Sequence, residues 1–121
     1  MHRFKDLEIW KKSQNLCVGV YQHTGDFPRS ETFGLQSQIR RSAVSIPSNI
    51  AEGTSRNSNK EFARFIEIAL GSAYELETQL MIANSLDYLE NGIFESLTRE
   101  LNAIIQMTMK FRSRLKVDSI R

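Results

Sequence analysis

The sequence has 121 residues, of which 40% are hydrophobic and 25% are charged, with a formal net charge of +2. This composition is that of one globular domain and excludes an intrinsically disordered chain. No apolar run approaches the roughly 20 residues of a membrane span, the first residues show no signal-peptide pattern, and the single cysteine excludes an intramolecular disulfide. We therefore expect a cytoplasmic protein with no membrane association.

Apolar residues at helical spacing predict a first helix over about residues 7–24. Asp6 is its expected N-cap, and Gly25 ends it together with Phe27-Pro28. The residues expected on its buried side are Leu7, Trp10, Cys17, Val20 and Tyr21.

A second helix is predicted over about residues 34–52, and Gly53 stands where a C-terminal cap belongs. Its apolar stripe is Leu35, Ile39, Ala43, Ile46 and Ile50. Pro47 lies inside this segment, lacks an N–H, and crowds the carbonyl four residues before it. We expect one helix kinked at Pro47, because the stripe continues in phase beyond it. The alternative is a helix that stops near Ser45 and restarts.

Two further helices are predicted over about residues 59–86 and 92–116, separated by Asn91-Gly92. The third begins with a capping box, Ser58-Asn59-Lys60-Glu61. Its stripe is Phe62, Phe65, Ile66, Ala69, Ala73, Leu76, Leu80 and Ala83. The stripe of the fourth is Ile93, Leu97, Leu101, Ile104, Thr108, Phe111 and Leu115. This spacing, with short connections, predicts an all-α, antiparallel up-down four-helix bundle that occupies residues 1–121 as one domain.

A row of polar residues flanks the apolar stripe of the second helix. At about 100° per residue, the residues that share this flank are Gln38, Ser42, Ser45, Asn49 and Glu52. Such a row is either a buried hydrogen-bond network or a recognition surface, and a network is the more frequent case.

Gly71 projects from the side of the third helix opposite its apolar stripe, although a glycine within a helix costs about 1 kcal/mol relative to alanine. Ile68, Tyr74 and Ile82 lie on or near the same side. A helix that is apolar on two sides is usually buried on two sides, whereas a monomeric bundle buries only one. The sequence therefore predicts a subunit interface, in which Gly71 permits close approach.

No pattern of catalytic, metal-binding or cofactor-binding residues is visible. Neither His2 nor His23 belongs to the Glu-x-x-His pairs of di-iron bundles, and one cysteine cannot supply a zinc site. No glycine-rich phosphate loop follows a strand. We expect no enzymatic activity, no metal and no cofactor.

Basic residues gather near the junction of the second and third helices and in the fourth helix. They form either a solvated helix face with a frayed tail or a surface for a polyanion. The candidates for contact with RNA or DNA are Arg40, Arg41, Arg56, Lys60, Arg64, Lys110, Arg112, Arg114 and Lys116. Because Phe111 belongs to the core stripe, no aromatic side chain beside them can stack on bases. Binding should therefore be electrostatic and weakly selective for sequence.

The stretch Gln38–Gly53 resembles the signature of a bacterial four-helix-bundle family, named for proteins encoded in intervening sequences of 23S rRNA genes. Three further segments resemble its opening, first loop and third helix. They are Phe4–Trp10, then Phe27-Pro28 with Glu31 and Phe33-Gly34-Leu35, and finally Ser58–Phe62 with Ile68–Glu77. The resemblance implies a ring-like homopentamer without enzyme activity. It also implies kinship with accessory proteins of diversity-generating retroelements, which are basic bundles that associate with nucleic acid and a reverse transcriptase.

Two functional hypotheses follow from the sequence. In the first, a self-assembling oligomer binds RNA or DNA through basic patches that are pooled over its copies. In the second, an oligomeric scaffold binds another protein, and its charges serve only solubility.

Overall fold

The computed structural model describes residues 3–120, with side chains described up to Val117, and these residues form helices and no strand. The four long helices are α1 (Glu8–His23), α2 (Leu35–Thr54), α3 (Asn59–Ser85) and α4 (Asn91–Ile120). Two 3-10 helices, η1 (Phe4–Asp6) and η2 (Arg29–Glu31), precede α1 and α2. The prediction of an all-α four-helix bundle is confirmed. Among the described residues, no helix combines the length and apolar character that a membrane span requires.

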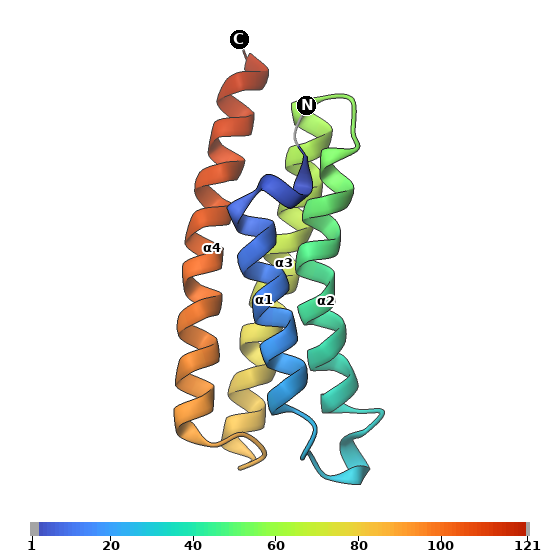
Figure 1. Ribbon diagram of the computed structural model, residues 1–121, viewed down its shortest axis with the longest axis vertical. Helices are drawn as coiled ribbons and strands as arrows, with labels where there is room; N and C mark the ends of the chain where they lie inside the picture. The colour runs from blue at the N-terminus through green and yellow to red at the C-terminus, as the bar shows by residue number, and fades with distance from the viewer. Residues whose placement is uncertain (1–2, 121) are drawn as a thin grey trace.

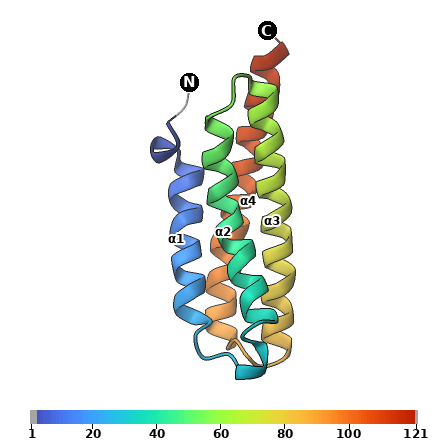
Figure 2. The ribbon, with the colours of Figure 1, turned by 90° about the vertical axis from the view of Figure 1, so that its right-hand side faces the viewer.

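Each helix runs back along the one before it, so that α1 and α3 descend while α2 and α4 ascend (Figure 1). The contact between α2 and α3 is the most extensive of the four between neighbouring helices and that between α1 and α4 the least, while the backbones of α1 and α3 do not approach each other across the bundle. The helices therefore occupy the corners of a square in chain order (Figure 2). Both chain ends lie at the same end of the bundle as the α2–α3 connection (Figure 1).

The apolar stripes predicted for α2, α3 and α4 form most of the core. The fully or nearly fully buried members include Ile39, Ile46, Ile50, Ile66, Leu76, Leu80 and Leu101. Leu35, Phe65 and Phe111 are only partly buried. Burial of these stripes supplies most of the free energy that holds the bundle together.

The side of α1 that faces the core differs from the prediction. The buried residues are Ile9, Ser13, Leu16 and Val20, whereas Trp10 and Cys17 are half-buried and Tyr21 is exposed. The cause is Ser13, which lies in the core seam and donates a hydrogen bond from Oγ to the carbonyl of Trp10 at 3.0 Å. This polar residue interrupts the apolar spacing from which the phase of a helix is read.

Two predicted helix ends are also corrected. Asp6 is not the N-cap of α1, because it lies in η1 and Leu7 takes the N-cap position. Gly53 is not a C-terminal cap, because α2 continues to Thr54 and no glycine among the described residues has a positive φ. A Cβ at Gly53 would lie 2.7 Å from Cδ1 of Phe62, so glycine here allows α3 to pack closely against α2.

Other helix boundaries agree more closely with the sequence. The Ser58 side chain caps α3 by accepting a hydrogen bond from the Glu61 N–H at 3.1 Å. α2 passes through Pro47 as one helix, and the kink predicted there stays a prediction. α4 continues to Ile120, four residues beyond its predicted end.

A cluster around Glu31 closes the end of the bundle opposite the chain termini. Glu31 Oε1 accepts the N–H of Leu35 at 2.9 Å, and Tyr88 donates its hydroxyl to Glu31 Oε2 at 3.4 Å. The Tyr88 ring packs on Phe27, with centroids 5.6 Å apart. Burial raises the pKa of the Tyr88 hydroxyl, and the Glu31 carboxylate raises it further. The cluster thus joins the α1–α2 connection to the α3–α4 connection.

Candidate nucleic-acid interface

Charged residues are absent from the middle of every helix. The uncharged segments are 13–22 in α1, 42–51 in α2, 68–74 in α3 and 101–109 in α4. Because neighbouring helices run in opposite directions, the segments of α2, α3 and α4 overlap near mid-height of the bundle, while that of α1 extends further toward the α1–α2 connection (Figure 1). Ser45 and Ser72, whose hydroxyls are 2.8 Å apart, mark this level on α2 and α3. We call these four segments the neutral belt.

The belt separates two ends with opposite charge. One end consists of residues 3–12, 52–67 and 110–117, and it carries eleven basic and five acidic side chains. The other consists of residues 23–41 and 75–100, and it carries four basic and eight acidic side chains. We call them the basic half and the acidic half. The small net charge of the chain therefore hides a strong separation of charge along the bundle axis.

The structure brings together seven of the nine residues predicted to contact nucleic acid. Those in the basic half are Arg56, Lys60, Arg64, Lys110, Arg112, Arg114 and Lys116. Arg40 and Arg41 lie in the acidic half, near the other end of α2. At 1.5 Å per residue they are about 20 Å from Arg56 along the bundle axis. Arg40 is held there by hydrogen bonds to Thr24 Oγ1 at 3.0 Å and to the Tyr21 carbonyl at 3.2 Å, with its guanidinium over the Tyr21 ring.

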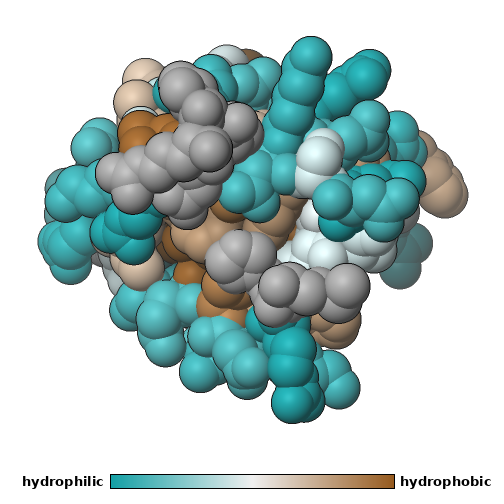
Figure 3. Space-filling model, turned by 90° about the horizontal axis from the view of Figure 1, so that it is seen from above, coloured by the Kyte–Doolittle hydropathy of each residue, from teal (hydrophilic) through white to brown (hydrophobic). Residues whose placement is uncertain are grey.

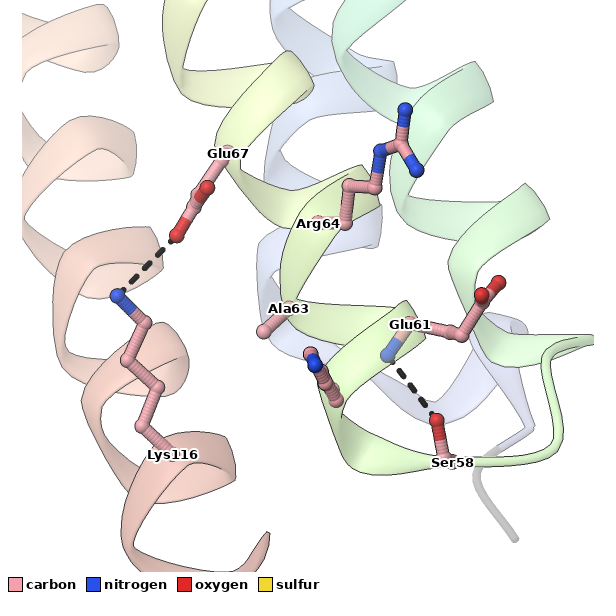
Figure 4. A pocket seen from close by; sticks show the side chains of 7 residues that line it. Ser58, Glu61, Ala63, Arg64, Glu67 and Lys116 are labelled. Atoms are coloured by element: carbon pink, nitrogen blue, oxygen red, sulfur yellow. Dashed lines mark hydrogen bonds and ion pairs between the residues drawn. The ribbon is translucent and has the colours of Figure 1, made fainter.

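A groove between the start of α3 and the last turns of α4 holds part of the basic set (Figure 4). Lys116 reaches across it to Glu67, with Nζ and Oε1 3.1 Å apart. The guanidinium of Arg64 points away from α4. Because the Lys116–Glu67 pair is about half exposed, it contributes little stability, and a phosphate could replace the carboxylate at small cost.

A second groove lies between the start of α1 and α4. Lys110 and Arg114, one turn apart on α4, line it opposite Asp6 and Glu8. On the other side of the bundle, Arg56 stacks over the Phe65 ring, 4.5 Å from guanidinium carbon to centroid, and pairs with Glu52 at 3.1 Å. Hydrophilic side chains surround this end of the molecule (Figure 3). The basic groups therefore encircle the end rather than fill one pocket.

The polar row of α2 divides into a network and an exposed part. Ser42 donates to Glu75 Oε1 at 3.1 Å, and the Asn49 amide donates to the Ser45 hydroxyl at 2.9 Å. The Ser45 hydroxyl also bonds to Ser72. Gln38 and Glu52 are exposed. The α3 partners Ser72 and Glu75 were not predicted, because pairing across helices depends on a register that no single helix shows.

The residues predicted to form a subunit interface lie on the outer side of α3. Ile68, Tyr74 and Ile82 are all exposed by 45–49%, and a Cβ at Gly71 would meet nothing within 4 Å. Met81 and Leu86, which were not predicted to belong to the interface, are exposed to a similar extent. At about 100° per residue, Ile68, Ile82 and Leu86 share one side of α3. Apolar exposure repeated along one helix side is typical of a surface that binds another molecule.

Comparison with known proteins agrees with this architecture. The model of the 23S rRNA-intervening sequence protein family matches residues 5–110. The chain belongs to this family. A solved structure similar to this intervening-sequence protein is that of a protein of unknown function from the S23 ribosomal protein family of Bacteroides thetaiotaomicron VPI-5482. The two are 25% identical, with a TM-score of 0.78 over 86% of this chain and 97% of that chain. No curated protein sequence matches the chain.

The match to the family also bears on the candidate interface. It ends at Lys110, so the basic residues Arg112, Arg114 and Lys116 follow the matched region. Among the described residues, no group of three or more His, Cys, Asp or Glu side chains is arranged to hold a metal ion.

Proposed function

We propose that this intervening-sequence protein is a non-enzymatic, self-assembling bundle that binds the phosphate backbone of RNA or DNA through its basic half. The observation that carries the proposal is the separation of charge, with eleven basic and five acidic side chains at one end. An excess of Lys and Arg on one end creates a positive potential that attracts polyanions.

The chemistry of the basic half favours phosphates over bases as the groups that are bound. Its aromatic rings are engaged in packing, since Phe62 and Phe111 meet edge to face with centroids 5.4 Å apart, and Phe4 meets Trp10 in the same way at 5.1 Å. Open aromatic faces are the usual platforms on which single-stranded bases stack. Binding through charge alone is strongly salt-dependent and tolerates any sequence.

Self-assembly supports the same function. One basic half offers a modest number of phosphate contacts, and an oligomer that presents several on one surface would gain affinity without any new contact. The exposed apolar side of α3 is the surface that favours assembly. The same surface supports the second candidate, an oligomeric scaffold for another protein with no role for nucleic acid.

The salt dependence of binding tests the proposal. Fluorescence anisotropy would measure the affinity for labelled single-stranded RNA and duplex DNA of unrelated sequences. If about four phosphates are neutralised, affinity should fall roughly 100-fold between about 50 and 200 mM salt. Similar affinities for unrelated sequences are expected. Absence of binding at low salt, or an affinity unchanged by salt, would eliminate nucleic-acid binding and leave the scaffold.

A further inference from the structure

Lys116 and Glu67 form an ion pair across the groove between α3 and α4. Lys116 Nζ and Glu67 Oε1 are 3.1 Å apart, although the two residues lie on different helices (Figure 4). In the part of the chain that the structure describes, the other ion pairs all join residues three or four positions apart. Local pairs of that kind are common along helices. The Lys116–Glu67 pair instead fixes a charged side chain across an open groove.

The groove contains two further cations, which are arranged differently. Lys60 and Arg64 line it together with Lys116. The guanidinium of Arg64 points away from α4, whereas Lys116 reaches across toward α3 (Figure 4). Neither Lys60 nor Arg64 has an ion-pair partner among the described residues. The Glu67 carboxylate therefore lies where an anion bound in the groove would meet the Lys116 ammonium.

The ion pair is weak enough to be exchanged. Lys116 is 56% exposed and Glu67 is 47% exposed. Water and salt screen such a pair, so its paired state is favoured over the open state by roughly 5-fold at most. Lysine binds phosphate as a point charge, as it binds a carboxylate. A phosphate that displaces Glu67 would therefore replace one exposed ion pair by another.

The cations on the other flank of α4 are not held by a carboxylate. Lys110 and Arg114 line the groove between α1 and α4, opposite Asp6 and Glu8. These two carboxylates pair with basic residues of their own segment, 3.8 and 3.5 Å away, and not across the groove. One flank of α4 thus presents cations that are open to phosphate, whereas the other presents a cation that a carboxylate already holds.

We infer that the groove between α3 and α4 binds one phosphate of a nucleic-acid backbone at the Lys116 ammonium, and that Glu67 competes with this phosphate. Glu67 then lowers the affinity of the basic half without preventing binding, because the other cations remain open. The inference rests on the nucleic-acid binding in the proposed function and adds a carboxylate that regulates it. Lys116 follows the region that the family model matches, so the match does not extend to this pair.

Removal of the competing carboxylate tests the inference. Glu67→Gln should raise the affinity for labelled duplex DNA roughly 3- to 5-fold at physiological salt, because Lys116 no longer has to leave its partner. The matched control is Glu61→Gln, which changes the charge of the same groove equally. Glu61 has no ion-pair partner among residues 3–117, so this control should raise affinity by less than about 1.5-fold.

A double-mutant cycle with Lys116 shows whether the effect passes through this lysine. In a Lys116→Gln background, Glu67→Gln should change the affinity by less than about 1.5-fold, because the ammonium for which the two anions compete is gone. The salt dependence is a second readout. Each additional phosphate contact steepens the log–log slope by about 0.9 for duplex DNA, so Glu67→Gln should steepen it by up to that amount. Glu61→Gln should leave the slope unchanged.

The possible failures can be told apart. Equal gains from Glu67→Gln and Glu61→Gln, or the same gain with and without Lys116, would overturn the inference but leave nucleic-acid binding standing. Millimolar inorganic phosphate at matched ionic strength should not displace the DNA. Displacement from wild type but not from Lys116→Gln would identify a site for the free ion and would also overturn the inference. Absence of binding by both wild type and Glu67→Gln at low salt would overturn the proposed function itself.

Discussion

The basic half and the acidic half share one core but present opposite surfaces. Fully buried isoleucines of α2, Ile39 and Ile50, lie in or beside each half, and the same four helices run through both. The basic half carries eleven basic and five acidic side chains, whereas the acidic half carries four basic and eight acidic side chains. Packing and charge are therefore specified independently in this bundle. The core determines the fold along its whole length, while the surface assigns each end its own partner chemistry.

The largest effect is expected from truncating buried isoleucines, which tests whether the core is equally well packed at both ends. Ile39→Ala and Ile50→Ala each remove a side chain with no exposed surface, so each should lower the free energy of unfolding by about 2–5 kcal/mol. Chemical denaturation at one fixed protein concentration measures both. The two losses should agree to within about 1 kcal/mol. A much smaller loss at one site would show that its half is loosely packed.

Glycines near the two ends should respond differently to alanine. At Gly53 the new Cβ would meet the buried Phe62 ring at 2.7 Å, so Gly53→Ala should cost about 1–3 kcal/mol through overpacking. At Gly34 it would meet a carboxylate oxygen of Glu31, which can rotate away at the expense of its bond to the Leu35 N–H and its longer bond to the Tyr88 hydroxyl. Gly34→Ala should therefore cost about 1 kcal/mol. Thermal unfolding compares them, and an equal or reversed order would contradict the packing described at Gly53.

Charge reversal tests the functional difference between the halves. Lys110→Glu/Arg114→Glu in the basic half should weaken RNA and DNA binding by roughly 10- to 100-fold, because repulsion replaces phosphate contacts. Arg29→Glu/Arg99→Glu changes the net charge equally in the acidic half. It should leave affinity within about twofold at physiological salt. Equal losses from both variants would show that net charge, rather than its location, controls binding.

The smallest expected effect is a pH dependence of the free energy of unfolding, and it arises in the acidic half, from Tyr88. The folded protein raises the pKa of Tyr88 above that of the unfolded chain, so protonated Tyr88 contributes stability at neutral pH. That contribution is lost as pH rises above about 10, the ordinary value for tyrosine. Denaturation between pH 8 and 11 should show a steeper loss for wild type than for Tyr88→Phe. If the free energy of unfolding fell equally with pH in both proteins, the raised pKa of Tyr88 would be contradicted.

Much of the fold follows from the sequence because each stripe repeats over many turns. The stripes of α2 and α3 contain few polar interruptions, and their predicted phase is confirmed. In α1 a buried serine, Ser13, shifted the predicted stripe to the edge of the buried side, so that Val20 is buried but Trp10 and Cys17 are only half-buried. Gly53 was misassigned because glycine at a cap and glycine at a close approach look alike in a sequence.

The candidate site could be predicted only in part. Counting charge in blocks along the chain mixes the two ends, since α3 and α4 each start in one half and finish in the other. The uncharged middle of every helix was the signal that could have revealed the two halves.

The neutral belt weakens the electrostatic coupling between the two halves. Its segments are seven to ten residues long, which separates the charges along each helix by about 10–15 Å. The Debye length at physiological ionic strength is about 8 Å. Most charges of one half are therefore screened from those of the other, and the exception is Lys12 and Glu100, which line one hollow between α1 and α4. A polyanion held at the tip of the basic half is then felt only weakly at the far end. Each end can acquire or lose a partner through mutation without altering what the opposite end binds.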